Sequence, residues 1–290
     1  MAEPIVRQNA ILGEGALWDS KRGLLLWIDI LGQCVYQYDP ISETNRRFDV
    51  GADVGTVVPN QSGGAIVALK EGFATLDFDT GNVNLVAFCE ANISANRFND
   101  GKCDPAGRLW AGTMAYTGAK GAGKLYCLER DFSVSVKIDN VTISNGIAWS
   151  SNQKVMYYID TATFTIAAFD YDQETGEIAN QRVAVQIDEK LGFPDGMAID
   201  VEDKLWVAMY NGGKVCRFDP VSNALIESVD VPGATQVTSC AFGGKNLDEL
   251  YITSASYEMT PEDWASYPLA GSLYRTTLDV HGAPTHVFGG

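Results

Sequence analysis

One short pattern recurs six times along this chain of 290 residues. In each copy a glycine or charged residue precedes an apolar run that leads to a large or β-branched residue. Successive markers are separated by about 40 to 50 residues, a period typical of the four-stranded blades of a β-propeller. The six marker residues are Trp27, Val67, Trp110, Tyr157, Trp206 and Tyr251.

A second pattern follows each marker and predicts further strands. Segments such as VYQYDPISE and IAAFDYDQETGE alternate in polarity and end in Asp-Pro or Glu-Thr-Gly, which favours successive β-hairpins. We therefore predict an all-β fold, a six-bladed β-propeller, made by residues 1–290 as a single domain. A helical turn is expected only at residues 260–267, where Thr260, Pro261 and Glu262 form a typical N-terminal cap.

The ends of the chain are predicted to close this ring. If the inner strand of the first repeat begins near Leu24, residues 4–12 remain as one extra strand. We expect that strand to pair with the C-terminal repeat, because closure protects sheet edges that would otherwise be exposed. A long β-sandwich or two barrels would not explain six repeats in one phase.

Charge and rare residues narrow the possible functions. The 21 Lys and Arg residues against 37 Asp and Glu residues give a net charge of -16, which disfavours nucleic acid and membrane surfaces as partners. His281 and His286 are the two histidines, so a His-rich zinc site is excluded and a Ser-His-Asp centre would need the C-terminal tail, which we expect to be exposed. Without CxxC pairs, a signal sequence or a long apolar segment, we expect a cytoplasmic protein that is a monomer or weak homo-oligomer.

Four polar residues share one phase relative to the markers. Glu14, Asn99, Asn145 and Asp195 each lie about 11 to 13 residues before a marker. Equivalent positions of a propeller converge on its central channel, where each unpaired polar group costs roughly 1–3 kcal/mol. A hard cation explains such oxygen ligands, so Ca²⁺, Mg²⁺ or Mn²⁺ is expected, with Zn²⁺ also possible.

Each of these segments alone is typical of an ordinary turn, and their shared phase carries the prediction. A glycine follows three of the four residues and is expected to let the backbone bend so that the side chain reaches the axis. In the second and sixth repeats the same slot holds residues 53–55 and 238–240, which we interpret as channel wall, with Asp53 undecided.

Arg97 lies two residues before Asn99, at the same end of the channel. It could form a salt bridge with Asp100, or it could donate hydrogen bonds to substrate oxygens. We favour the second interpretation because the planar guanidinium suits carboxyl and polyol oxygens.

The stretches that carry these residues resemble the gluconolactonase and regucalcin family of sugar lactonases. The similar segments are LGEGALWD, NRFNDGKCDPAGRLWAGTM, ISNGIAWS, FPDGMAIDVEDKLWVAMYNGGKV and SCAFGGKNLDELYITSA. The resemblance implies a six-bladed propeller with one divalent metal held by Glu14, Asn145 and Asp195. It also implies that Arg97 and Asn99 bind substrate and that Asp195 transfers protons. Thr117 stands where animal members have a substrate-site glutamate, so the preferred substrate does not carry over.

These observations lead to a functional hypothesis with two alternatives. The hypothesis is metal-dependent hydrolysis of a sugar lactone, a gluconolactone-like small molecule, with Asp195 as general base and metal ligand. One alternative is a calcium-binding regulatory protein without significant catalysis. The other is a propeller scaffold that binds partners, which predicts that the side chains of Glu14 and Asp195 lie several ångströms apart.

Overall fold

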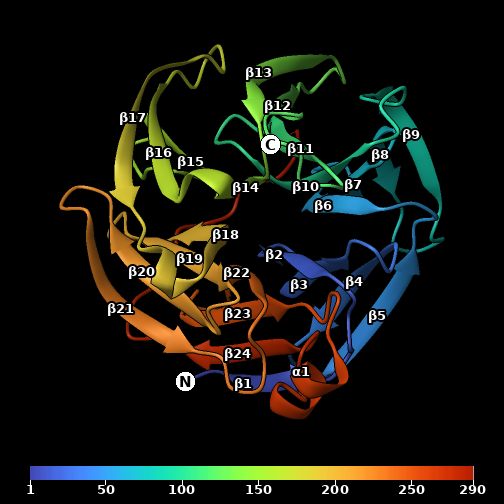
Figure 1. The fold of residues 1–290 in the computed structure, drawn as a ribbon. Coiled ribbons are helices and arrows are strands. Elements are labelled where there is room, and N and C mark those ends of the chain that lie inside the picture. The colour runs from blue at the N-terminus through green and yellow to red at the C-terminus, as the bar shows by residue number, and fades with distance from the viewer. Residues whose placement is uncertain (290) are drawn as a thin grey trace.

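The computed structural model describes residues 1–289, which form six four-stranded antiparallel sheets arranged as a ring (Figure 1). We number these sheets as blades 1 to 6 in chain order. The innermost strands of the six blades contact one another around the centre. The predicted all-β six-bladed propeller is confirmed. These innermost strands are β2 (Gly13–Asp19), β6 (Val54–Pro59), β10 (Asn96–Cys103), β14 (Ser144–Trp149), β18 (Phe193–Ile199) and β22 (Val237–Gly243).

The other strands follow outward in each blade. The second strands are β3 (Leu24–Asp29), β7 (Ala65–Leu69), β11 (Leu109–Ala115), β15 (Val155–Asp160), β19 (Leu205–Tyr210) and β23 (Glu249–Ser254). The third strands are β4 (Cys34–Asp39), β8 (Gly72–Leu76), β12 (Gly123–Leu128), β16 (Thr165–Tyr171), β20 (Lys214–Asp219) and β24 (Leu273–Thr277). The outer strands are β5 (Thr44–Asp49), β9 (Val83–Phe88), β13 (Val134–Val141), β17 (Ile178–Gln186), β21 (Ala224–Asp230) and, in blade 6, β1 (Glu3–Val6).

The marker residues all lie on second strands, which corrects one detail of the sequence prediction. Blade 1 has β2 as its innermost strand, so the strand that begins at Leu24 is the second one. Strand β2 is hard to recognise from sequence because its first residues are Gly-Glu-Gly, which a strand pattern does not favour.

The N-terminal strand closes the ring as predicted, although it is shorter. Strand β1 pairs antiparallel with β24 and completes blade 6. It ends at Val6 because the following residues turn, with Asn9 at a positive φ of 53°. The backbone N–H groups of Ile11 and Leu12 then donate to the carboxylate of Asp29, each at 2.9 Å, instead of to a strand.

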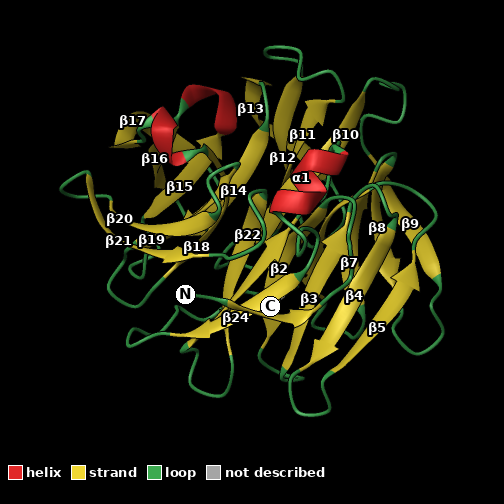
Figure 2. Cartoon of the chain, turned by 60° about the horizontal axis from the view of Figure 1, so that its bottom comes forward, coloured by secondary structure: helices red, strands yellow, loops and turns green. Residues whose placement is uncertain are grey.

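Helical structure is confined to short segments outside the sheets (Figure 2). Helix α1 (Pro261–Ser266) lies where the sequence predicts it, and Thr260 is its N-cap, paired with Asp263 in a capping box. Two 3₁₀ turns occupy Thr161–Thr163 and Glu189–Leu191. Within residues 1–289, none of the helices has the length and apolar character needed to cross a bilayer.

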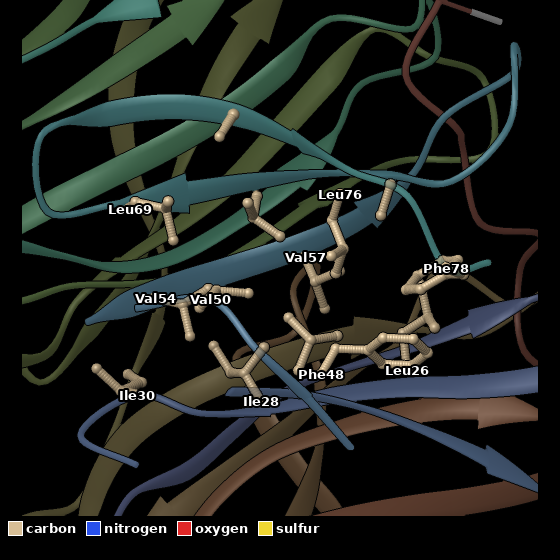
Figure 3. Packing of buried hydrophobic residues seen from close by; sticks show 14 of the residues in the cluster. Leu26, Ile28, Ile30, Phe48, Val50, Val54, Val57, Leu69, Leu76 and Phe78 are labelled. Carbon is tan, nitrogen blue, oxygen red and sulfur yellow. The ribbon is translucent and has the colours of Figure 1, made fainter. Parts of the chain in front are cut away.

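The hydrophobic core consists of layers between neighbouring blades. In one such layer, Leu26 and Ile28 of blade 1 pack with Val57 and Leu76 of blade 2 (Figure 3). The large markers are part of these layers, and Trp27 and Trp110 have no exposed surface. Because each blade is half of two layers, a blade cannot bury its faces without both neighbours.

The C-terminal segment, residues 278–289, crosses the ring on the side opposite the candidate site described below. It exchanges backbone hydrogen bonds with blades 6, 5, 2 and 3, and the hydroxyl of Thr285 donates to the carbonyl of Trp18 in blade 1. Phe288 near its end is 3% exposed and packs between blades 2 and 3. The expectation of an exposed tail is therefore wrong, since sequence does not reveal that the tail binds across several blades.

We expect Phe288→Ala to lower the free energy of unfolding by about 2–4 kcal/mol, because it removes a buried ring that joins two blades. Urea unfolding followed by tryptophan fluorescence measures this. Phe88→Ala is the matched control, since Phe88 is 72% exposed and its loss should change stability by less than about 0.5 kcal/mol. Equal effects of the two variants would show that the tail does not fasten the ring.

Candidate active site

A bulge at the same place in all six innermost strands builds the site. The pairing of each innermost strand with its neighbour shifts register near its start, as between Glu14 and Leu17 or between Pro194 and Met197. A bulge interrupts the alternation of side chains and re-aims one of them. This is the physical reason why polar residues of one phase meet in the channel.

Glycines next to the bulges are needed for different reasons. Gly15 has a positive φ of 60°, which favours glycine. Gly146 and Gly196 instead lie where the next innermost strand comes close: a Cβ on Gly146 would meet the carbonyl oxygen of Asp195 at 2.8 Å. The expected backbone flexibility thus applies to Gly15, whereas the other two glycines permit close packing of the strands.

The three predicted metal ligands are neighbours, and two of them, Asn145 and Asp195, line a cavity. Glu14, Asn145 and Asp195 are 3%, 3% and 7% exposed. Both Glu14 and the amide of Asn145 influence the pKa of the Asp195 carboxyl, so the three side chains are neighbours. The backbone N–H of Gly15 donates to Glu14 Oε2 at 2.7 Å. The separation of Glu14 and Asp195 that the scaffold alternative predicts is not observed.

Burial makes the negative charge of these carboxylates costly. Burial, and then the neighbouring carboxylates of Asp195 and Asp100, raise the pKa of Glu14 well above its usual range. Burial and Asp100 likewise raise the pKa of Asp195. Such a cluster of close carboxylates is stabilised either by protons or by a cation.

Arg97 and Asn99 lie beside the ligands and are linked to them. The amide nitrogen of Asn99 donates to Asn145 Oδ1 at 3.2 Å and to the carbonyl of Ser144 at 2.7 Å. Arg97 Nη1 donates to Asn99 Oδ1 at 2.6 Å and to the carbonyl of Phe98 at 3.0 Å. Arg97 therefore contacts Asn99, and the alternative salt bridge with Asp100 does not form.

Buried Asp100 and half-buried Lys102, close to the ligands, were not identified from the sequence. Asp100 accepts from the backbone N–H of Gly101 at 2.7 Å, and burial raises its pKa to about 6 despite the nearby ammonium of Lys102. Lys102 Nζ donates to the carbonyl of Met197 at 2.5 Å. Their two-residue spacing after the bulge in NDGK could have predicted that both side chains point to the channel.

Asn145 and Asp195 line a cavity of about 320 Å³ at one mouth of the channel. Its wall includes Tyr116, Tyr210 and Tyr257. None of these tyrosines occupies the repeat position that the ligands share. Tyr116, rather than the neighbouring Thr117, faces the cavity. A second cavity of about 300 Å³ lies at the opposite mouth beneath the C-terminal segment and lacks the carboxylate ligands.

The undecided Asp53 belongs to the rim of the cavity. Its carboxylate accepts from the hydroxyl of Tyr116 at 2.5 Å and from Gln33 Nε2 at 3.0 Å. The guanidinium of Arg97 lies 6.0 Å from the Tyr116 ring centre, and Lys70 Nζ lies 4.9 Å from it. In blade 6, the hydroxyl of Thr238 donates to the carbonyl of Gly13, as expected for channel wall.

In the presence of a metal chelator, we expect the protein to lose stability as the pH rises above the ordinary carboxyl pKa of about 4. The raised pKa values mean that the folded state retains protons that the unfolded state has released, so a rising pH favours unfolding. Each such carboxyl contributes about 1.4 kcal/mol per pH unit between its unfolded and folded pKa values. Urea unfolding at several pH values tests this, and Glu14→Gln should flatten the slope. A slope that Glu14→Gln leaves unchanged would contradict the assignment to this cluster.

Comparison with known proteins places this chain in a family. The profile described as "SMP-30/Gluconolactonase/LRE-like region" matches residues 12–256. The chain belongs to this family. Regucalcin of Xenopus laevis is 40% identical over 99% of this chain and 98% of its own length, and regucalcin of Homo sapiens is 39% identical with the same coverage.

Solved structures of similar proteins share the whole fold of this SMP-30/gluconolactonase family member. A calcium-binding protein, regucalcin, from Agrobacterium tumefaciens has a TM-score of 0.94 and 25% identity, covering 99% of this chain and 97% of its own. A luciferin-regenerating enzyme has a TM-score of 0.92 and 34% identity, covering 99% of both chains. A gluconolactonase from Xanthomonas campestris, at 20% identity, TM-score 0.75 and coverage of 97% and 89%, supports the fold alone.

Proposed function

We propose that this protein hydrolyses the lactone of a sugar acid to the open acid, with Asp195 as general base. One observation carries the proposal: in a member of the SMP-30/gluconolactonase family, Asn145 and Asp195 line one cavity together with Arg97 and Asn99. Glu14 is buried next to Asp195. The gluconolactonase named in the family description and the luciferin-regenerating enzyme, which is 34% identical, support an enzymatic role.

The donor set fits a hard divalent cation. Within residues 1–289 no three His, Cys, Asp or Glu side chains are grouped closely enough to hold a metal ion. The candidate ligand set instead combines two carboxylates with the amide oxygen of an asparagine. Glu14 and Asp195 are buried carboxyl groups whose pKa values are raised, first by burial and also by the nearby carboxylate of Asp100. A cation would neutralise their negative charge, and oxygen ligands of this kind suit Ca²⁺, Mg²⁺ or Mn²⁺. Glu14, Asn145 and Asp195 would hold the ion. When bound, it would supply Lewis-acid polarisation of the lactone carbonyl.

The residues of the chain would perform the remaining steps. Asp195 accepts a proton from a water molecule as the water oxygen bonds to the carbonyl carbon. The bond from that carbon to the ring oxygen then breaks, and Asp195 returns the proton to the ring oxygen as it leaves. Arg97 donates hydrogen bonds from its remaining N–H groups to orient the substrate toward the attacking water. Asn99 lines the cavity beside it and contacts the substrate while its amide group holds Arg97 and Asn145 in place.

A calcium-binding role without catalysis is the second candidate. It uses the same ligands, and the names of the regucalcin relatives favour it. The two functions differ in one measurable property, which is turnover of lactones above their spontaneous opening.

The test is a pH-indicator assay of five- and six-membered aldonolactones. We expect hydrolysis well above the spontaneous rate, loss of activity after EDTA treatment and dialysis, and recovery with at least one of Ca²⁺, Mg²⁺, Mn²⁺ or Zn²⁺. Metal-dependent thermal stabilisation without turnover of any lactone would favour the calcium-binding role. Full activity in the metal-free protein would contradict the metal requirement.

A further inference from the structure

The second cavity, at the mouth opposite the candidate active site, contains an ammonium group with free donors. Lys102 is half-buried and lines this cavity, not the first one. One of its three N–H groups donates to the carbonyl of Met197, and within residues 1–289 Lys102 forms no salt bridge, whereas Lys124 and Lys204 do. Burial lowers the pKa of Lys102, a shift that the carboxylate of Asp100 opposes. An anion in the cavity would therefore stabilise the charged ammonium.

Other polar groups of the lining leave further donors for a ligand. The ring of His286 and the amide of Gln153 line the cavity and make no side-chain hydrogen bond within residues 1–289. Each of them can donate to an acceptor in the cavity. The hydroxyls of Ser150, Ser151 and Thr285 already donate to acceptors that do not line the cavity.

No carboxylate of residues 1–289 lines this cavity, although the chain has a net charge of -16. Two carboxylates affect the pKa values of lining residues, Asp100 that of Lys102 and Asp104 that of His286. Asp100 lines neither cavity, and Asp104 is paired with Arg108 at 2.6 Å. The ammonium of Lys102 is therefore the charge that a ligand would meet.

The rest of the wall is largely apolar, and the cavity opens to solvent. Val201 at its edge is 54% exposed, and Ser151 and Pro284 are also exposed. The volume of about 300 Å³ is at the lower end of the range for ligand cavities, so a small molecule fits. An apolar ligand body would gain free energy on burial against this wall. Its apolar residues include Leu17, Ala148, Ala198, Ile199, Ala241 and Phe242.

We propose that the second cavity binds a small organic acid, a monocarboxylate whose compact apolar body packs against the wall while its carboxylate accepts from Lys102. Hydrogen bonds between an ammonium and a carboxylate are roughly twice as strong as those between neutral groups. Inorganic phosphate would leave the apolar wall without a partner, and a polyhydroxylated acid would bury hydroxyl groups there unpaired. This site is separate from Glu14, Asn145 and Asp195 and does not depend on the lactonase function proposed above.

Isothermal titration calorimetry of the full-length protein tests this chemistry. The ligands are 4-bromobenzoate, its neutral isostere 4-bromobenzamide, and two anions without an apolar body, acetate and inorganic phosphate. We expect 4-bromobenzoate to bind at least tenfold more tightly than the other three, with a negative heat-capacity change from burial of its ring. Equal affinity for the benzoate and the benzamide, or tighter binding of phosphate, would overturn the proposal.

One variant and one control assign the charge that is recognised. Lys102→Met removes the ammonium and keeps the length of the side chain. It should weaken binding of 4-bromobenzoate at least tenfold and leave binding of 4-bromobenzamide unchanged, a difference that a general loss of structure does not produce. Lys245→Met is the matched control, since Lys245 is exposed and does not line the cavity, and both affinities should be retained. Undiminished benzoate binding by Lys102→Met would contradict the assignment.

Crystals of the parent protein soaked in 4-bromobenzoate locate the ligand even if Lys102→Met does not fold. Anomalous scattering from bromine should give a peak in the second cavity, with a carboxylate oxygen about 2.7–2.9 Å from Lys102 Nζ. A bromine peak beside Arg97 alone would place the acid in the first cavity and refute the proposal. Absence of an ordered bromine would refute it as well.

Discussion

Asp195→Asn lowers kcat for lactone hydrolysis by roughly 10³-fold, the expected result if this carboxylate transfers the proton. Asparagine keeps the size of the side chain and an oxygen for the cation, but it cannot accept a proton from water. Asp195 is buried, and it lines the cavity in which the substrate would bind. Initial rates by the pH-indicator assay measure the loss.

The control for this result must separate catalysis from metal binding. Elemental analysis should show that Asp195→Asn holds the same cation as the parent protein at saturating metal, and Asp195→Ala should be equally inactive while remaining folded. Asp79→Asn makes the same change in an exposed turn and should retain full activity. More than a tenth of the parent activity in metal-loaded Asp195→Asn would refute its role as general base.

Asp104→Ala has the largest effect that we expect on stability, a loss of about 3–5 kcal/mol. Asp104 has no exposed surface, and its Oδ2 atom accepts from Arg108 Nε at 2.6 Å and Trp110 Nε1 at 2.9 Å. The hydroxyl of Tyr171, on β16 of the next blade, donates to the same oxygen at 2.8 Å. Without this carboxylate, the buried guanidinium of Arg108 loses its ion-pair partner.

Equilibrium unfolding in urea measures that loss, with Asp79→Ala as the exposed control. The control should change stability by less than about 0.5 kcal/mol. Lactone hydrolysis by the folded fraction of Asp104→Ala should be retained, because Asp104 does not line the candidate active site. A cost below about 1 kcal/mol would show that the network between blades 3 and 4 adds little stability.

The same arrangement in blade 5 shows a signal that sequence analysis overlooked. Asp200 accepts from Trp206 Nε1 at 3.0 Å and from Arg217 Nε at 2.8 Å. Asp104 and Asp200 both lie six residues before their tryptophan markers. This repeated spacing could have predicted that the two carboxylates bind the indole N–H groups.

Site residues that occupy a repeated position could be predicted from the sequence, whereas those without a counterpart in the repeat could not. Glu14, Asn145 and Asp195 could be found because a polar residue recurs at one phase of a repeat, and that phase places them at equivalent bulges. Their metal-binding and catalytic roles remain predictions for the experiments above. Tyr116 and Tyr257 have no counterpart in the repeat, so their place in the cavity wall was not predictable.

By itself, the sequence determined the number of blades, the closure of the ring by β1 and the residues that converge on the channel. Each of these follows from the sequence repeat, which can be recognised in each segment of the chain without knowledge of long-range contacts. The tertiary structure alone decided that Asp100 and Lys102 lie close to the ligands, that the tail crosses the ring and that three tyrosines line the cavity of the candidate site. These features arise where segments far apart in the chain pack together, and their contacts depend on the geometry of the closed ring.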